Sequence, residues 1–435
     1  MTHLCSLDCR SSVVPFIGLS LSVLLSSSLT YGQSAATEPQ VVTDAEVLPV
    51  DPTQPTGPVE VWTSTPEDIP SFPPPDSGVF ASPSVRPAAG PPVAGLRPRI
   101  YYRYQYAEGI PNGPGERHSS HVHEFTPGIL WHIGERLQLD YAPSFIYYSN
   151  DAIEDSIDHS LALTWNTHYE AWRFDAAHRY RRSNSVLIET GSQSKRENFL
   201  TTVGALRELN SRWAWESRLN HHSRQTETLQ DFGEYAGEQR LLYSVSERLG
   251  LSLAAAYGYV KVDDGSNHEY IRPRFTVDYR PGEKLSLRGW AGAENRWYKN
   301  GLETTSPVYQ VSANYLPVEA TQLTLSYGRA IQPSYFEDAV TRRRAWDVSL
   351  TQRFLGRYFL TVRASRQDVA YSTITPSAID GRHDVTTSYS ARLSTPIRDR
   401  GFIAVFYEPE SDNESNRDAF TYSLRTYGVE GGWQF

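Results

Sequence analysis

The amino-acid sequence predicts an all-β fold: a transmembrane antiparallel β-barrel of about 18 strands that follows a disordered, Pro-rich N-terminal tail. Three observations lead to this prediction. Apolar and polar residues alternate from Arg99 to the C-terminus, which is the period of two that β-strands require. Short and long connections between these strands alternate strictly. The N-terminus has the pattern of a secretory signal peptide.

Residues 1–36 form the predicted signal peptide. Arg10 precedes an apolar stretch from Ser11 to Thr30, and small residues follow it at Gly32, Ser34, Ala35 and Ala36. A charged segment, an apolar segment and a small-residue cleavage site are typical of secretory signals. A membrane anchor is the alternative, but the stretch is rich in serine and short for a membrane span.

Residues 37–98 are predicted to form a disordered tail. Between Pro39 and Pro98 lie 15 of the chain's 28 prolines. Proline removes backbone donors and favours the polyproline II conformation, so this segment cannot build a core. We expect a semi-stiff spacer. The alternative is an arm that binds a periplasmic partner or enters the barrel, anchored by Trp62, Phe72 and Phe80.

Residues 99–435 are predicted to form the barrel. Ile100, Tyr102 and Tyr104 would share one strand face, and Tyr101 and Arg103 the other. The same alternation recurs throughout this region. It assigns Leu163, Leu287 and Val348 to the apolar face. Their neighbours Thr164, Arg288 and Ser349 are assigned to the polar face.

The connections give the strand number. Eight short connections are expected near Gly134, Tyr169, Leu209, Glu247, Pro281, Pro317, Leu355 and Arg398. Nine longer polar connections are expected at 107–118, 149–156, 183–196, 225–232, 263–267, 299–306, 332–341, 372–382 and 408–417. Seventeen connections join 18 strands, and an even number places both barrel ends on the short-turn side. A β-propeller or a soluble β-sandwich fits less well, because each period of about 40 residues holds two long strands.

The last nine residues carry the most specific local pattern. Aromatic and apolar residues alternate there, at Tyr427, Val429, Trp433 and Phe435. This segment resembles the C-terminal strand of Gram-negative outer-membrane proteins, which implies recognition by the barrel assembly machinery. The chain from about Arg99 to Phe435 is similar to the β-barrel porins found in loci for exopolysaccharide export. The resemblance implies a location in the bacterial outer membrane, among its lipids, and says little about the substrate.

The polar face would line the lumen of such a barrel. It would hold 13 basic against 7 acidic side chains, with compensating acids such as Glu408 in the tail and the long loops. The basic residues singled out are Arg173, Arg179, Arg181, Arg272, Arg274, Arg288, Arg363 and Arg392. Rings of arginine select anions, which indicates an anionic solute or polysaccharide. The alternative is that wall charges pair across neighbouring strands and hold the register.

No enzyme, cofactor or metal site is predicted. The net charge of −9 and the pI of about 5.8 argue against nucleic-acid binding. The only cysteines, Cys5 and Cys9, precede the apolar stretch, so no thiol follows it. His121 and His123 share a strand face, but no third metal ligand is evident near them. No motif for a nucleophile elbow or a phosphate-binding loop stands out.

The predicted function is therefore an outer-membrane channel, either for porin-like passage of solutes or for polysaccharide export, with a weak preference for anions. A structural barrel whose Pro-rich tail recruits a periplasmic partner is the alternative. An outer-membrane hydrolase is the third reading, since a catalytic site assembled from distant strands leaves no local motif.

Overall fold

The computed structural model describes residues 95–187, 189–263, 265–336, 338–374, 379–398 and 400–435. The predicted signal peptide, and the predicted tail up to residue 94, lie outside the described residues. The described part contains 18 strands and one short 3₁₀ helix, η2 (Asp418–Phe420). The strands are β1 (Gly95–Pro111), β2 (Arg117–Ile133), β3 (Leu137–Tyr148), β4 (Ser156–Tyr169), β5 (Trp172–Leu187), β6 (Ser192–Glu208), β7 (Trp213–Thr226), β8 (Phe232–Ser246), β9 (Leu249–Val262), β10 (His268–Gly282), β11 (Leu285–Tyr298), β12 (Glu303–Val318), β13 (Thr321–Pro333), β14 (Ala339–Phe354), β15 (Tyr358–Thr373), β16 (His383–Ile397), β17 (Gly401–Ser415) and β18 (Tyr422–Gln434).

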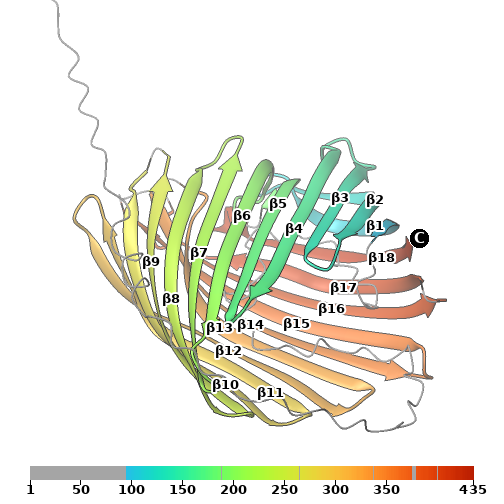
Figure 1. Cartoon of the computed structure of the whole chain (residues 1–435). Coiled ribbons are helices and arrows are strands. Elements are labelled where there is room, and N and C mark those ends of the chain that lie inside the picture. Colours follow the sequence, from blue (N-terminus) through green and yellow to red (C-terminus); the bar gives the residue numbers. More distant parts are fainter. Residues whose placement is uncertain (1–94, 188, 264, 337, 375–378, 399) are drawn as a thin grey trace, which may run out of the picture. The chain divides into compact units, whose positions relative to one another are not determined.

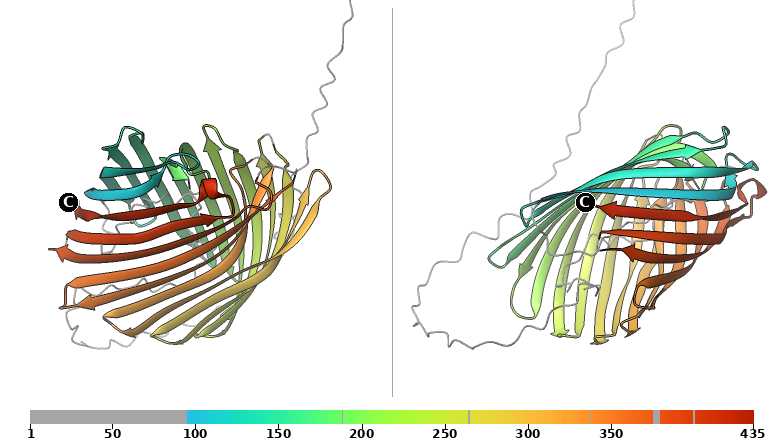
Figure 2. Two further views of the ribbon diagram at one scale, coloured as in Figure 1. Left: turned by 180° about the vertical axis from the view of Figure 1, so that it is seen from behind. Right: turned by 90° about the vertical axis from the view of Figure 1, so that its right-hand side faces the viewer.

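The strands form one closed antiparallel barrel, which confirms the predicted fold and strand number. Each strand pairs with its neighbours in the chain, and β1 also pairs with β18 over Arg99 to Glu108. Figure 1 shows the strands following one another around the wall, and Figure 2 shows β1 beside the C-terminal strand. The N–H of Phe435 donates to the carbonyl of Pro98 at 2.9 Å, so the last residue is tied to the first strand. No helix among the described residues is long and apolar enough to cross a membrane.

The short connections lie where the sequence pattern placed them. At the β14–β15 turn, Leu355 and Gly356 both adopt positive φ, at 49° and 73°, the left-handed backbone that tight hairpins require. The connection at 263–267 lies as predicted, and the other long connections are shorter than expected, from four residues at 188–191 to nine at 374–382. Polar residues beside the loops therefore continue the strands.

The last long connection was predicted at 408–417, and this was wrong. Strand β17 continues to Ser415, and the connection spans residues 416–421 and includes η2. An irregularity between Glu408 and Ser411 shifts the register, after which pairing with β18 resumes. The strand outlasts its apolar pattern because its polar residues still make ladder hydrogen bonds.

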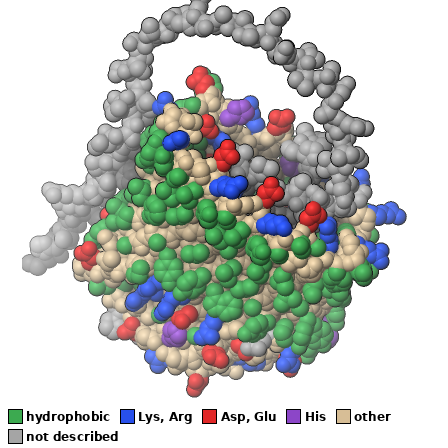
Figure 3. Space-filling view, turned by 90° about the horizontal axis from the view of Figure 1, so that it is seen from below, with side chains coloured by type: hydrophobic (Ala, Val, Ile, Leu, Met, Phe, Trp, Pro, Cys, Tyr) green, Lys and Arg blue, Asp and Glu red, His purple; other side chains and the backbone are tan. Residues whose placement is uncertain are grey.

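The outward face of the barrel is apolar. Leu253 and Leu219 are 62% and 65% exposed, and large hydrophobic residues are exposed in the same manner on every strand except β5. A band of hydrophobic side chains crosses the face seen in Figure 3, with charged side chains on both sides of it. This is the surface that a transmembrane barrel presents to lipid. Leu163, Leu287 and Val348 share this outer face.

One junction in the wall is incomplete. Strands β12 and β13 pair from Val318↔Thr321 to Tyr309↔Arg329, and no pairing joins the remaining ends, residues 303–308 and 330–333. If the register continued, Pro307 would lie opposite Ile331, and proline has no N–H to donate. The inner side chain of Arg296 donates to the carbonyl of Ile331 at 3.3 Å instead. The backbone ladder of the wall is therefore interrupted near the long-loop end, where Val308 and Ile331 pack with Trp290.

Candidate functional site: the inner face and the loops across its mouth

The inner face of the barrel carries most of the buried charge. The eight predicted basic residues all lie on the strand face opposite the exposed apolar residues. Five of them form close ion pairs: Arg272 with Glu294 (2.6 Å), and Arg274 with Glu238, Arg288 with Asp278, Arg363 with Asp347 and Arg392 with Glu430, each at 2.5 Å. Pairing across the wall thus neutralises most of the predicted positive excess.

Several of these pairs join into a continuous chain of charges. Arg218 contacts Glu216 at 2.7 Å, and Glu216 lies 3.6 Å from Arg240. Arg240 contacts Glu238 at 3.0 Å, and Glu238 accepts from Arg274 at 2.5 Å. All five side chains are largely buried. Buried charges persist only when they are paired in this manner.

Small side chains on β9 make this chain possible. Arg274 on β10 and Glu238 on β8 are separated by β9, whose inner face there carries Ala254 and Ala256. Gly258 continues this series, and a Cβ at that position would lie 2.3 Å from the ring of Tyr270. The small inner residues of β9 thus leave room for longer side chains of β8 and β10 to meet across this strand.

Arg179 and Arg181 on β5 differ from the other inner arginines. Within the described ranges, neither forms an ion pair or a hydrogen bond with another residue. Arg179 is exposed and lies between Ala162 and Leu200, and Arg181 lies between Ser160 and Asn198. The third predicted base on this strand, Arg173, is 3.8 Å from the exposed Glu208. Arg179 and Arg181 are therefore two positive charges on the inner face that no described carboxylate within 4.0 Å neutralises.

Several acids of the inner face were not predicted from the sequence. Glu238 and Glu430 pair with inner arginines, and Glu124 is also buried on this face. Glu430 follows the outward-facing Val429, so the alternation already indicated its orientation. Glu408 was expected in a loop, which was wrong: it lies on β17, 3.9 Å from Arg103.

The two histidines of β2 lie on the outer face. Tyr104 and Tyr102 make hydrogen bonds of 2.8 Å with Nδ1 of His121 and His123, respectively. Tyr427 and Val429 of the C-terminal strand are exposed on the same face. Trp433 is partly buried and lies against Gly401, and Phe435 is exposed at the end of the strand.

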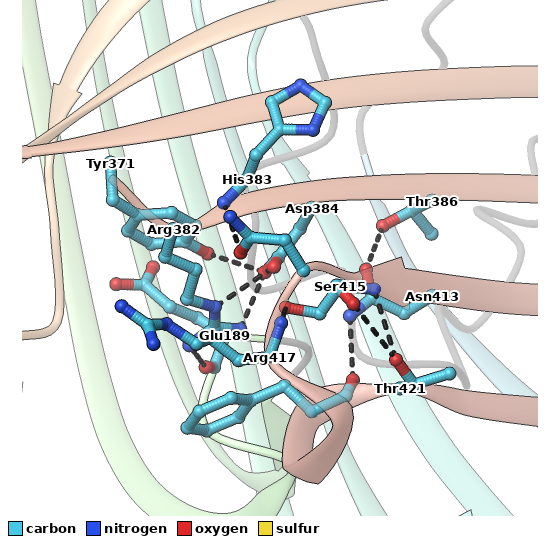
Figure 4. Close-up of polar contacts among 12 residues, drawn as sticks. Glu189, Tyr371, Arg382, His383, Asp384, Thr386, Asn413, Ser415, Arg417 and Thr421 are labelled. Atoms are coloured by element: carbon cyan, nitrogen blue, oxygen red, sulfur yellow. Dashed lines mark hydrogen bonds and ion pairs between the residues drawn. The ribbon is translucent and has the colours of Figure 1, made fainter. Parts of the chain in front are cut away.

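Loops from distant parts of the ring meet at the long-loop end and form a mouth cluster of Glu189, Ser334, Tyr335, Arg382 and Phe420. Glu189 accepts hydrogen bonds from the hydroxyl of Ser334 and, at 2.9 Å, from the N–H of Tyr335. Arg382 donates to the carbonyl of Glu189 at 2.8 Å, and its guanidinium lies 3.7 Å from the centre of the Phe420 ring. Figure 4 shows Glu189, Arg382 and Asp384 of this region close together.

Two inner-face residues brace this cluster. Arg382 also forms a two-pronged ion pair with Asp384, at 3.0 and 2.6 Å. Arg224 on β7 donates to the carbonyl of Ser334 at 2.6 Å and lies 3.6 Å from the centre of the Tyr335 ring. Arg382, Ser334 and Tyr335 are each at most 1% exposed.

The mouth cluster crosses the opening of the barrel. Glu189 lies in the β5–β6 loop and Ser334 in the β13–β14 loop, and the ring between these two hairpins contains six strands in one direction and eight in the other. At about 4.8 Å per strand, the path along the wall is many times longer than a hydrogen bond. Hydrogen-bonded contact between these loops therefore requires that they reach across the mouth and narrow it.

Comparisons with known proteins give structural likeness only. No family model matches the sequence, and no curated protein matches it. The outer membrane protein OpdK of Pseudomonas aeruginosa is similar with a TM-score of 0.41 at 11% identity, over 78% of this chain and 98% of that one. OccK2 (OpdF) of the same organism gives 0.43 at 11% identity, over 78% and 98%. OccAB3 of Acinetobacter baumannii gives 0.43 at 8% identity, over 79% and 100%. The fold described above rests on this chain's own strand pairing.

Proposed function

We propose that this protein is an outer-membrane channel for small solutes, with its short turns in the periplasm and its long loops outside the cell. The observation that carries the proposal is the division of the barrel into an apolar outer face and a charged inner face. Barrels of 16 to 18 strands are wide enough to leave an aqueous channel, whereas the interior of a barrel of about eight strands is filled by its own side chains.

The mouth cluster favours small solutes over a polymer. Residues from three loops are hydrogen-bonded across the opening, so a wide polysaccharide would have to break buried contacts. Export of an exopolysaccharide, the other kind of passage that the sequence left open, is therefore the less favoured form of the proposal. Polysaccharide export predicts that an anionic polysaccharide binds to the intact channel and blocks it.

Arg179 and Arg181 would give the channel a preference for anions. Most of the other inner arginines are matched by a carboxylate at ion-pairing distance, so their fields largely cancel. An unpaired guanidinium at an exposed inner position raises the local concentration of anions, as charged rings do in pores.

The test is the reversal potential of the refolded barrel in a planar bilayer with a salt gradient. We expect anion preference that falls when Arg179 and Arg181 are replaced by Gln. The preference should also fade at high salt, because the Debye length falls from about 10 Å at 0.1 M to about 3 Å at 1 M. The matched control is Arg288→Gln with Asp278→Asn, which removes an inner ion pair without changing the net charge.

Other outcomes would contradict the proposal in different ways. A cation-selective pore would assign selectivity to acidic loops instead of these arginines. Absence of conductance, even without residues 37–94, would favour the alternative in which the barrel is a docking platform for a periplasmic partner. Recovery of the protein in the soluble periplasmic fraction would overturn the location.

A further inference from the structure

A group of arginines on the outer face has no place in a channel mechanism. Arg329 on β13, Arg342 and Arg344 on β14, and Arg366 on β15 share the outward face near the long-loop end. We call these four residues the arginine patch. Arg329 and Arg344 are direct cross-strand partners, and like charges in such positions destabilise a sheet.

The patch lacks compensating acids. In the described part of the chain, no carboxylate lies within 4.0 Å of any of its guanidinium groups. Asp368 is the cross-strand partner of Arg344, but its carboxylate is 2.6 Å from Nε2 of His383. Arg342 donates a hydrogen bond to the hydroxyl of Ser372 at 2.6 Å. Because this hydroxyl is neutral, it does not neutralise the charge of Arg342.

Other outward arginines at this end of the barrel have acidic partners. Arg182 lies 3.9 Å from Glu197, and Arg425 lies 3.6 Å from Glu108. These two outward arginines are therefore neutralised within the protein. Four arginines without an acidic partner on three adjacent strands are an exception that calls for an external anion.

The level of the patch indicates which anion. On each of the three strands the outward apolar run ends where the arginines begin, after Tyr327 on β13, Trp346 on β14 and Ala364 on β15. Tyr327 and Tyr309 form a hydrogen-bonded pair of 3.2 Å just below Arg329, as expected for aromatic residues at a membrane interface. The arginines therefore lie at the depth of the lipid headgroups.

The patch also contains a hollow. A cavity of about 100 Å³ is lined by Arg329, Arg342, Arg344, Asp368, Ala370 and His383. Three guanidinium groups converge on it from two strands, and guanidinium groups bind phosphate oxygens through paired hydrogen bonds.

We propose that the arginine patch binds the phosphate groups of a phosphorylated glycolipid in the outer leaflet. The lipid supplies the negative charge that the protein lacks and relieves the repulsion between Arg329 and Arg344. The inference rests on the proposed orientation in the outer membrane and is independent of conduction through the lumen.

The experiment measures binding of diphosphoryl lipid A to the refolded full-length protein in neutral detergent micelles, by native mass spectrometry and by titration. The test variant replaces Arg329, Arg342 and Arg344 with Gln. We expect its affinity to fall about a hundredfold, since each basic residue near anionic lipid contributes a comparable share. The control variant, Arg182→Gln with Arg425→Gln, should bind within about twofold of the parent.

Three results would overturn the inference. The first is that the test variant binds lipid A as tightly as the parent does. The second is that dephosphorylated lipid A binds the parent as well as diphosphoryl lipid A does. The third is that millimolar inorganic phosphate binds as tightly as the lipid. The last result would show a free-anion site. The test variant must retain its heat-dependent electrophoretic shift and its single-channel conductance, so a failure of folding or of the channel proposal is recognised separately.

Discussion

Replacement of Leu253 by Arg tests the assignment of the two barrel faces most directly. Leu253 is 62% exposed on β9, and its cross-strand partners are Leu241 on β8 and Phe275 on β10, both exposed and apolar. The outward positions along β9 on either side of it, Leu251 and Ala255, are also apolar. An arginine here would have no polar group beside it on the outer face.

The expected cost follows from the depth of the site. An arginine on the lipid face of a β-barrel costs about 2–4 kcal/mol at the bilayer midplane and less near the interfaces. Each 1.4 kcal/mol is a tenfold change in an equilibrium constant, so the folded-to-unfolded ratio should fall by roughly thirtyfold or more. The measurement is an unfolding titration with guanidinium chloride of the barrel in phospholipid vesicles, in which tryptophan fluorescence reports unfolding.

Two further variants isolate the effect of the charge. Leu253→Ala removes the same side chain without adding a charge and should cost much less than Leu253→Arg. Thr164→Arg introduces the charge on the inner face of β4, where water is available, and should also cost less. Equal costs for Leu253→Arg and Thr164→Arg would refute the assignment of the faces and with it every inner residue named above.

Three other predictions follow from contacts described above. Arg382→Gln removes the guanidinium that holds the mouth cluster together and should raise single-channel conductance and its fluctuations; unchanged conductance would mean that the cluster does not narrow the pathway. A Cβ at Gly428 would lie 2.1 Å from a backbone oxygen of β1, so Gly428→Ala should lower the midpoint of unfolding. A Cβ at Gly282 would meet nothing within 4 Å, so the control Gly282→Ala should leave the midpoint unchanged. Equal midpoints for the two variants would contradict this prediction. Deletion of Phe435 should reduce the heat-modifiable, membrane-inserted form in cell fractions and leave secretion across the inner membrane intact; normal insertion would argue against its role as an assembly signal.

The strands and short turns could be predicted because their signals are local. Alternation around Leu163 or Val348 depends only on adjacent residues, and a turn such as Leu355-Gly356 is marked by the residues that form it. The even strand number and the closed barrel followed from counting such signals. Strand ends could not be predicted as well, because polar residues such as Asp412 and Asn413 pair in the ladder without an apolar pattern.

The charge balance of the inner face could not be predicted from local signals. Arg274 meets Glu238 only because β9 between them presents alanine, and this depends on the register of three strands. The mouth cluster is further out of reach, since Glu189 and Ser334 are 145 residues apart in the chain. Nothing near either residue in the sequence marks the other as its partner.

The interrupted junction between β12 and β13 has a consequence for how the barrel comes apart. A closed barrel ordinarily has no free sheet edge, yet the ends at 303–308 and 330–333 are two such edges facing each other. The junction between β1 and β18, by contrast, is paired without interruption from Arg99 to Glu108. Fraying should therefore begin between two strands that are neighbours in the chain, and amide protons at 304–306 should exchange before those that close the ring. Strands β1 and β18, which are the first and last strands of the chain and close the ring, would then be among the last to separate.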